Sequence, residues 1–144
     1  MKSPYNDMDP LIAKFRNQAI KECRRYNFLV NAQNDYPLSI LEGIFQQIGV
    51  DVYIEPNFYC EFGFNLSLGS HIYINHDLVI LDCAQVTIGN HVWIGPKVGL
   101  YCANHAEDPV RRANYEVTSK PICIKDGVWL GASVVVLPGV TIGE

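Results

Sequence analysis

The sequence has 144 residues, of which 49% are hydrophobic and 18% charged, and its formal net charge is −4. This length suits one compact domain with a core of its own. An acidic chain without a run of Lys or Arg argues against a nucleic-acid partner. No stretch of about 18 apolar residues predicts a membrane span, and the N-terminus lacks the apolar core of a signal peptide, so we expect no membrane partner and a cytoplasmic location.

The cysteines do not form a recognisable framework. There are five of them, an odd number, and no pair makes a C-x-x-C motif: Cys23, Cys60, Cys83, Cys102 and Cys123. We interpret them as small buried hydrophobic residues in a reducing compartment. The spacing of the cysteines and of the four histidines predicts no metal site.

A first helix is predicted close to the N-terminus. Asp9 is a suitable N-cap and Pro10 suits the first turn. Apolar residues then recur at steps of three and four residues as far as Cys23, which makes one apolar face. Arg24 and Arg25 are expected in the last turn, where cations suit the helix dipole.

A second helix is predicted from Pro37 to about Gln47, with Gly49 as its stop. Residues 1–50 are therefore expected to form an N-terminal segment of two short α-helices.

After residue 50 the sequence has a period of six. Each unit opens with an aliphatic residue, which a small residue usually follows. The opening positions are Leu68, Ile74, Ile80, Ile88, Ile94, Leu100, Ile124, Leu130, Val136 and Ile142. Such a repeat is typical of a parallel β-helix, in which three hexads make one triangular coil and the opening residues stack inside. A β-sandwich would not explain the shared register, so residues 51–144 are predicted to form an all-β solenoid.

The repeat is interrupted between residues 101 and 121, where the sequence is polar. We predict a loop extruded from the solenoid, and long loops in compact folds are usually functional. His105 stands at its base, close to Glu107 and Asp108. A His beside carboxylates can be held in one tautomer and act as a general base, although a single loop His does not identify an enzyme.

Two further residues have two interpretations each. Asp82 interrupts an aliphatic stretch, so it is either a structural corner residue or directed at a ligand. Trp129 ends a hexad and is either a packing cap or a platform for a flat ligand.

Motifs spread over nearly the whole chain are similar to those of one enzyme family. They are Tyr5-x-Asp7, a helix with Arg16 that continues to Tyr26-Asn27, Ile54-Glu55-Pro56, Gly63-x-Asn65, Tyr73-x-Asn75, Asn104-His105-x-x-Asp108-Pro109, Lys120-Pro121, Val128-Trp129-Leu130-Gly131 and Pro138-Gly139-Val140-Thr141-Ile142-Gly143. The chain resembles the galactoside/maltose O-acetyltransferases, which include the nodulation acetyltransferases. The C-terminal motifs are common to hexapeptide-repeat acyltransferases, whereas the N-terminal signature joined to the His loop is specific to the sugar branch.

The resemblance implies a left-handed β-helix and a homotrimer with active sites in the clefts between neighbours. It implies that His105 removes the proton from a sugar hydroxyl, which attacks acetyl-CoA directly without a metal. It assigns six residues to the binding of the sugar acceptor: Asp7, Arg16, Glu61, Tyr73, Asp82 and Cys83. It assigns four residues to the binding of the co-substrate acetyl-CoA: Asn75, Trp129, Gly131 and Ala132.

The chain departs from the family pattern in three places. Glu61 is longer than the usual Ser or Asp, and Cys83 stands where some relatives have an acidic residue. The sequence is also C-terminally shortened, since it stops at Glu144, before about two further coils expected to grip the CoA adenosine and phosphates. Two alternatives therefore stay open, a truncated non-catalytic trimeric module and an acetyltransferase for a non-sugar acceptor.

Overall fold

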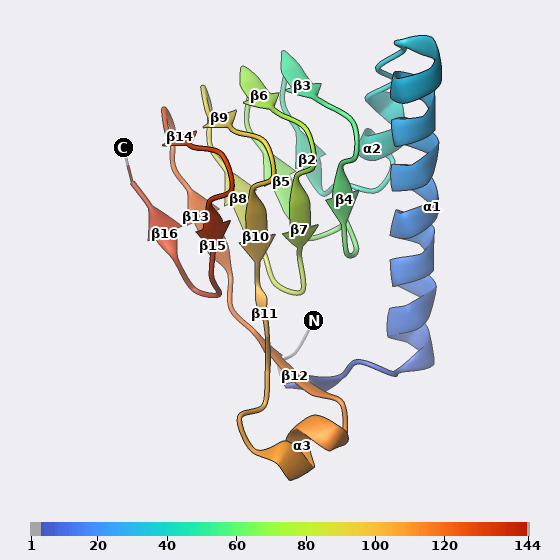
Figure 1. The fold of residues 1–144 in the computed structure, drawn as a ribbon, viewed down its shortest axis with the longest axis vertical. Helices are drawn as coiled ribbons and strands as arrows, with labels where there is room; N and C mark the ends of the chain where they lie inside the picture. The colour runs from blue at the N-terminus through green and yellow to red at the C-terminus, as the bar shows by residue number, and fades with distance from the viewer. Residues whose placement is uncertain (1–3, 144) are drawn as a thin grey trace.

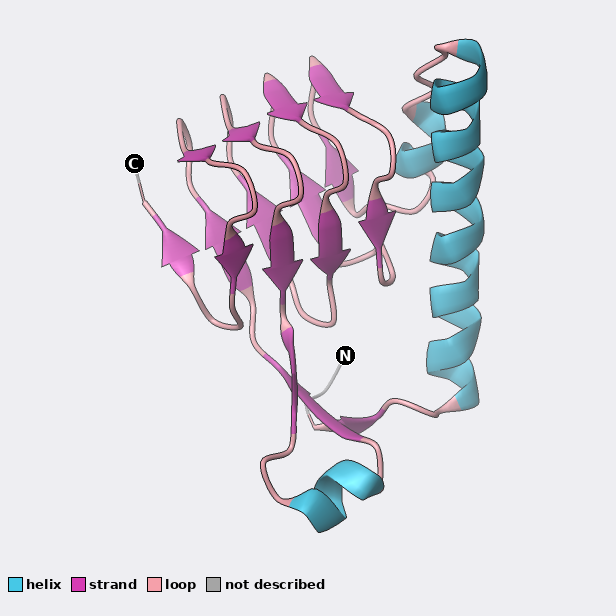
Figure 2. Ribbon diagram, viewed as in Figure 1, coloured by secondary structure: helices cyan, strands magenta, loops and turns pink. Residues whose placement is uncertain are grey.

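The chain is coiled into a three-sided parallel solenoid, with one long helix across one end and a hairpin extending from one corner (Figures 1 and 2). This computed structural model describes residues 4–143, so residues 1–3 and 144, at the outer ends of the two predicted segments, lie outside it. The predicted all-β solenoid is confirmed.

Three sheets form the sides of the solenoid, and the chain visits them in turn. The first sheet contains β2 (Gln47–Ile48), β5 (Leu66–Leu68), β8 (Val86–Ile88), β13 (Ile122–Ile124) and β16 (Thr141–Ile142). The second contains β3 (Val52–Ile54), β6 (Ile72–Ile74), β9 (Trp93–Ile94) and β14 (Trp129–Leu130). The third contains β4 (Tyr59–Cys60), β7 (Val79–Leu81), β10 (Gly99–Tyr101) and β15 (Val135–Val136). Neighbouring strands in these sheets are parallel, so each coil rests on the one before it.

The opening residues of the hexads form the core, as the period predicts. From Leu68 to Val136 each is at most 4% exposed, and only Ile142, in the last strand, is half-buried. The small residue after the opener has a steric reason at Gly69, where an added Cβ would lie 2.8 Å from the Gly89 carbonyl oxygen of the next coil. Coils that approach this closely leave no room for a side chain at that corner.

The first helix, α1 (Pro10–Gln33), is longer than predicted. Asp9 caps it as expected and accepts a hydrogen bond from the Leu11 N–H at 2.8 Å. The predicted end near Arg25 is wrong, because the apolar face continues through the buried Tyr26 and Val30. The helix ends at Asn34, which adopts the left-handed conformation that asparagine tolerates.

The residues after Arg25 dock α1 on the solenoid. The Tyr26 hydroxyl donates to the Ile54 carbonyl at 2.6 Å. The Asn27 side chain donates to the Phe58 carbonyl and accepts from the Phe58 N–H, at 2.9 and 3.0 Å. The Tyr-Asn pair thus gives α1 a fixed position against the first coil.

The predicted second helix, Pro37 to Gln47, is mostly wrong. The structure has one turn, α2 (Ser39–Glu42), and Gln47 already belongs to β2, where it pairs with Ser67 of β5. The backbone of residues 46–49 bonds to the next coil, so pairing with the solenoid overrides the local helical pattern.

The predicted extruded loop is present and has its own secondary structure. It consists of β11 (Ala103–His105), α3 (Pro109–Ala113) and β12 (Glu116–Ser119). β12 pairs antiparallel with β11 and with the N-terminal strand β1 (Tyr5–Asn6). The Asp108 carboxylate caps α3 by accepting from the Arg111 N–H at 2.8 Å. The two loop strands and β1 therefore form a small three-stranded sheet at the corner between the third and first sheets of the solenoid (Figure 2).

All five cysteines are free thiols, and all but the half-buried Cys123 are buried, which agrees with their interpretation as small hydrophobic residues. The Cys23 and Cys60 sulfurs lie 3.6 Å apart where α1 meets β4. Within residues 4–143 no helix has both the length and the apolar character that crossing a membrane requires.

Candidate active site

The three-stranded sheet of the extruded loop fixes the position of His105. His105 pairs with Val117 of β12, and Val117 pairs with Tyr5 of β1. Residues directly opposite each other on adjacent strands point to the same face of a sheet. His105, Val117 and Tyr5 therefore form one row across the sheet, and the His105 side chain is exposed.

Arg16 organises the acidic residues beside this row. Its Nη2 lies 2.5 Å from Asp7 Oδ1, and its Nε donates to Glu61 Oε1. Burial lowers the pKa of Arg16, but the bonds to Glu61 and Asp7 outweigh this effect and raise the pKa. The guanidinium also lies over the Phe62 ring, 5.7 Å from its centroid. Arg16 thus holds two carboxylates from distant parts of the chain in one place and neutralises much of their charge.

These residues meet in a pocket of about 110 Å³. Its lining consists of Tyr5, Asp7, Glu61, Leu81, Cys83, Ala103, His105 and Val117. The pocket combines an exposed imidazole, two carboxylates and an apolar wall. It can therefore hold a small polar molecule with one of its groups against a proton acceptor.

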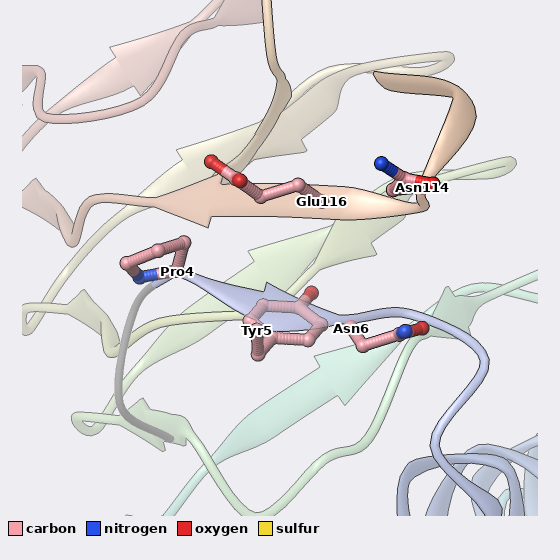
Figure 3. A pocket seen from close by; sticks show the side chains of 5 residues that line it. All are labelled: Pro4, Tyr5, Asn6, Asn114 and Glu116. Carbon is pink, nitrogen blue, oxygen red and sulfur yellow. The ribbon is translucent and has the colours of Figure 1, made fainter. Parts of the chain in front are cut away.

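A larger pocket of about 270 Å³ opens close by, lined by Pro4, Tyr5, Asn6, Asn114 and Glu116 (Figure 3). It contains no His or Cys, and its Glu116 carboxylate is bound by Arg111. This larger pocket has no imidazole or thiol that could accept a proton, and its carboxylate is already paired. We therefore place the candidate active site in the His105 pocket.

Asp82 and Cys83 follow β7 at the corner behind the pocket, and they have different surroundings. Asp82 is 0% exposed. Its carboxylate accepts the backbone N–H groups of Phe62 and Gly63 at 2.8 Å each, and of Asn65 at 3.4 Å. Burial raises the pKa of Asp82, and these bonds oppose that effect. Asp82 is thus a corner residue that holds the neighbouring coil, and it does not line the His105 pocket.

Cys83 lines the pocket as a neutral group. It is 4% exposed, and burial raises the pKa of its thiol to about 12. The position therefore carries no charge at neutral pH, in contrast to the acidic residue that some family members have there.

The remaining predicted residues lie elsewhere in the chain. Tyr73 is on β6 and Trp129 on β14, both in the second sheet. Asn75, Gly131 and Ala132 follow these strands, at the corner between the second and third sheets. In a three-sided prism the second sheet is the side opposite the corner that carries His105. One copy of the chain therefore does not bring these five residues to the His105 pocket.

The second sheet exposes an aromatic column. Tyr53 stacks on Tyr73 with the ring centroids 5.8 Å apart, and Trp93 is paired with Trp129 in the ladder. Trp93 is 63% exposed and Trp129 77% exposed. The sequence left two interpretations of Trp129, a packing cap and a platform for a flat ligand. The packing cap does not fit, because a side chain this exposed packs against little of its own chain.

Four pocket residues escaped the sequence analysis as site residues: Tyr5, Leu81, Ala103 and Val117. Tyr5 appeared in the N-terminal signature, and its spacing of two from Asp7 could have assigned it, because alternate residues of a strand share a face. Val117 had no such signal, since its place depends on pairing between the ends of a loop. Within residues 4–143 no group of three or more His, Cys, Asp or Glu side chains could hold a metal ion.

Comparison with known proteins places the fold among acetyltransferases. No family model matches the chain. Nodulation protein L of Rhizobium meliloti (strain 1021) is 40% identical over 138 residues, which cover 95% of this chain and 75% of that protein. Galactoside acetyltransferase in complex with coenzyme A has a TM-score of 0.91 at 33% identity, covering 98% of this chain and 70% of that one. A hexapeptide-repeat acetyltransferase of Vibrio cholerae, complexed with acetyl coenzyme A, has a TM-score of 0.87 at 37% identity, covering 96% and 75%.

The coiled hexads and the likeness to these relatives identify the chain as a hexapeptide-repeat acetyltransferase. Within that class, the chain belongs to the galactoside/maltose O-acetyltransferase family.

Proposed function

We propose that the protein transfers the acetyl group of acetyl-CoA to a hydroxyl of a sugar, with His105 as general base. The observation that carries the proposal is the pocket that His105 lines together with Asp7 and Glu61, the two carboxylates that Arg16 holds. Carboxylates accept hydrogen bonds from hydroxyl groups, so the pocket suits a polyol. The structures of two relatives were solved with coenzyme A or acetyl coenzyme A, which supports the choice of donor.

The reaction needs one proton acceptor and two aligned reactants. His105 takes the proton of the acceptor hydroxyl while its oxygen attacks the thioester carbonyl carbon. A backbone N–H stabilises the resulting oxyanion. When the intermediate collapses, the C–S bond breaks and the CoA thiolate takes the proton back from the imidazolium. Both substrates are bound at once, so orientation supplies much of the rate.

We further propose that the working unit is a homotrimer in which the second sheet of one copy faces the His105 pocket of its neighbour. Two features support this arrangement. Apart from Tyr73, the candidate acceptor residues lie on the opposite side of one copy from the candidate acetyl-CoA residues. On the second sheet Trp93 and Trp129 are more than half exposed. In this arrangement Asn75 and Trp129 approach the thioester and the pantetheine arm, Gly131 and Ala132 leave room for that arm, and Tyr73 contacts the acceptor. The cytoplasmic location stays a prediction.

A free-thiol assay of CoA release from acetyl-CoA, run over a panel of hydroxyl acceptors, tests the proposal. We expect release above background hydrolysis with at least one hexoside or oligosaccharide. Release with serine or an amino sugar alone would replace the sugar by a non-sugar acceptor. Absence of release together with no acetyl-CoA binding in calorimetry would instead favour the non-catalytic module.

A further inference from the structure

The hydroxyl of Tyr5 is an exception among the polar side chains of the protein. Within residues 4–143, it is the one buried side-chain nitrogen or oxygen that has no hydrogen-bond partner. A buried polar atom without a partner is rare in folded proteins and requires an explanation, because it has lost its water without gaining a replacement. Tyr5 also lines the His105 pocket. The exception therefore lies at the candidate acceptor site.

The neighbouring groups explain why the hydroxyl stays unpaired. The Cys83 thiol lies close enough to the Tyr5 hydroxyl for a weak side-chain interaction that raises the pKa of Tyr5. Sulfur is a weak hydrogen-bond acceptor, and this contact lacks the geometry of a hydrogen bond. The carboxylates of Asp7 and Glu61 are also close enough to act on Tyr5. Both are bound by Arg16 instead. The chain thus surrounds the hydroxyl with one poor acceptor and with two carboxylates that Arg16 holds in their own ion pairs.

The register of the loop sheet sets the distance from Tyr5 to His105. The two residues lie in one row, separated by Val117 on the middle strand. Two strand spacings amount to about 10 Å between their backbones. A sugar ring with its substituents is wide enough to meet both side chains from one position.

From this arrangement we infer that Tyr5 is an acceptor-binding residue whose hydroxyl is left unpaired in the free protein and donates a hydrogen bond to an oxygen of the bound acceptor. The inference rests on the proposed function and deepens it. It defines the acceptor as a molecule with a second oxygen, a hydroxyl or ring oxygen, on the far side of the ring from the reacting hydroxyl. Because burial raises the pKa of Tyr5, the phenol remains a donor throughout the neutral range, and it complements an oxygen of any neutral acceptor.

Tyr5→Phe removes the hydroxyl and keeps the ring. We expect the KM for the acceptor to rise roughly 3- to 12-fold, the scale of one lost neutral hydrogen bond, while kcat and the KM for acetyl-CoA stay within about 2-fold of wild type. The melting temperature without ligand should stay equal or rise, because the variant no longer buries an unpaired polar atom. Tyr115→Phe is the matched control, since it removes the hydroxyl of a tyrosine that is 55% exposed in the same loop.

Monodeoxy analogues of the best acceptor identify the oxygen. The analogue that lacks the oxygen bound by Tyr5 should give the same KM with wild type and with Tyr5→Phe, whereas the other analogues retain the difference. An unchanged KM for every accepted sugar would overturn the inference, and so would a lower melting temperature with a parallel loss of kcat, because both indicate a structural residue. Wild-type protein that releases no CoA with any acceptor would remove the proposed function itself and the inference with it.

Discussion

His105→Ala is expected to lower kcat by at least about 100-fold, the usual scale for the loss of a general base. The acceptor hydroxyl has a far higher pKa than imidazole, so without a base its oxygen stays protonated and attacks the thioester slowly. The fold should be unaffected, because the His105 side chain is exposed. Alanine also keeps the backbone N–H that donates to Asn104 Oδ1 at 3.0 Å. Steady-state kinetics by the free-thiol assay, with a melting curve beside it, measures both effects.

The control for this variant is His91→Asn. His91 is an exposed turn residue with φ of 55°, a backbone conformation that asparagine tolerates better than alanine. The His91→Asn substitution removes an imidazole without straining the turn, so this variant should keep wild-type kcat. An active His105→Ala protein would remove the proposed mechanism.

Asp82→Ala is expected to have the largest effect on stability. The substitution leaves the buried backbone N–H groups of Phe62, Gly63 and Asn65 without the acceptor that now binds them. Each unsatisfied buried donor costs roughly 1–3 kcal/mol, so a total of about 3–5 kcal/mol is expected. That corresponds to a fall in melting temperature of about 10 °C or more for a chain of this size.

Two further variants make the result specific. Asp82→Asn keeps one oxygen acceptor and should give an intermediate loss. Asp35→Ala removes a carboxylate from an exposed position and should leave the melting temperature within about 2 °C of wild type. A melting temperature of Asp82→Ala equal to that of Asp35→Ala would show that the corner does not depend on the buried carboxylate.

The solenoid could be predicted from the sequence because its core repeats locally. Each opening residue, from Leu68 to Val136, is buried by the same position one coil away, so a period of six is enough to identify it. The helix boundaries could not be predicted in this way. Arg24 and Arg25 indicated a helix end through the weak effect of the helix dipole, whereas α1 continues because Tyr26 and Val30 are packed.

The site depends on contacts between distant parts of the chain, and this limits what the sequence can predict. The resemblance assigned Arg16 and Glu61 to the sugar acceptor, but it did not predict their ion pair, and the local pattern around either residue does not show it. The sheet that orients His105 joins residue 5 to residue 117, and no local periodicity indicates that pairing. Asp82 shows the opposite case, since sequence alone left open whether it served the corner or a ligand, and burial decides for the corner.

Complementation between two inactive variants is the most direct test of the arrangement in which one copy supplies the base and its neighbour supplies the thioester wall. His105→Ala and Asn75→Ala are each expected to be inactive. When they are co-expressed with different tags and mixed trimers are purified, an interface is intact if its His105 comes from the Asn75→Ala copy and its Asn75 from the other. Every mixed trimer, whether 2:1 or 1:2, then has about a third of its interfaces intact, so we predict about a third of wild-type kcat in the free-thiol assay. Mixed trimers, verified by native mass spectrometry, that show no more activity than either parent would contradict the account.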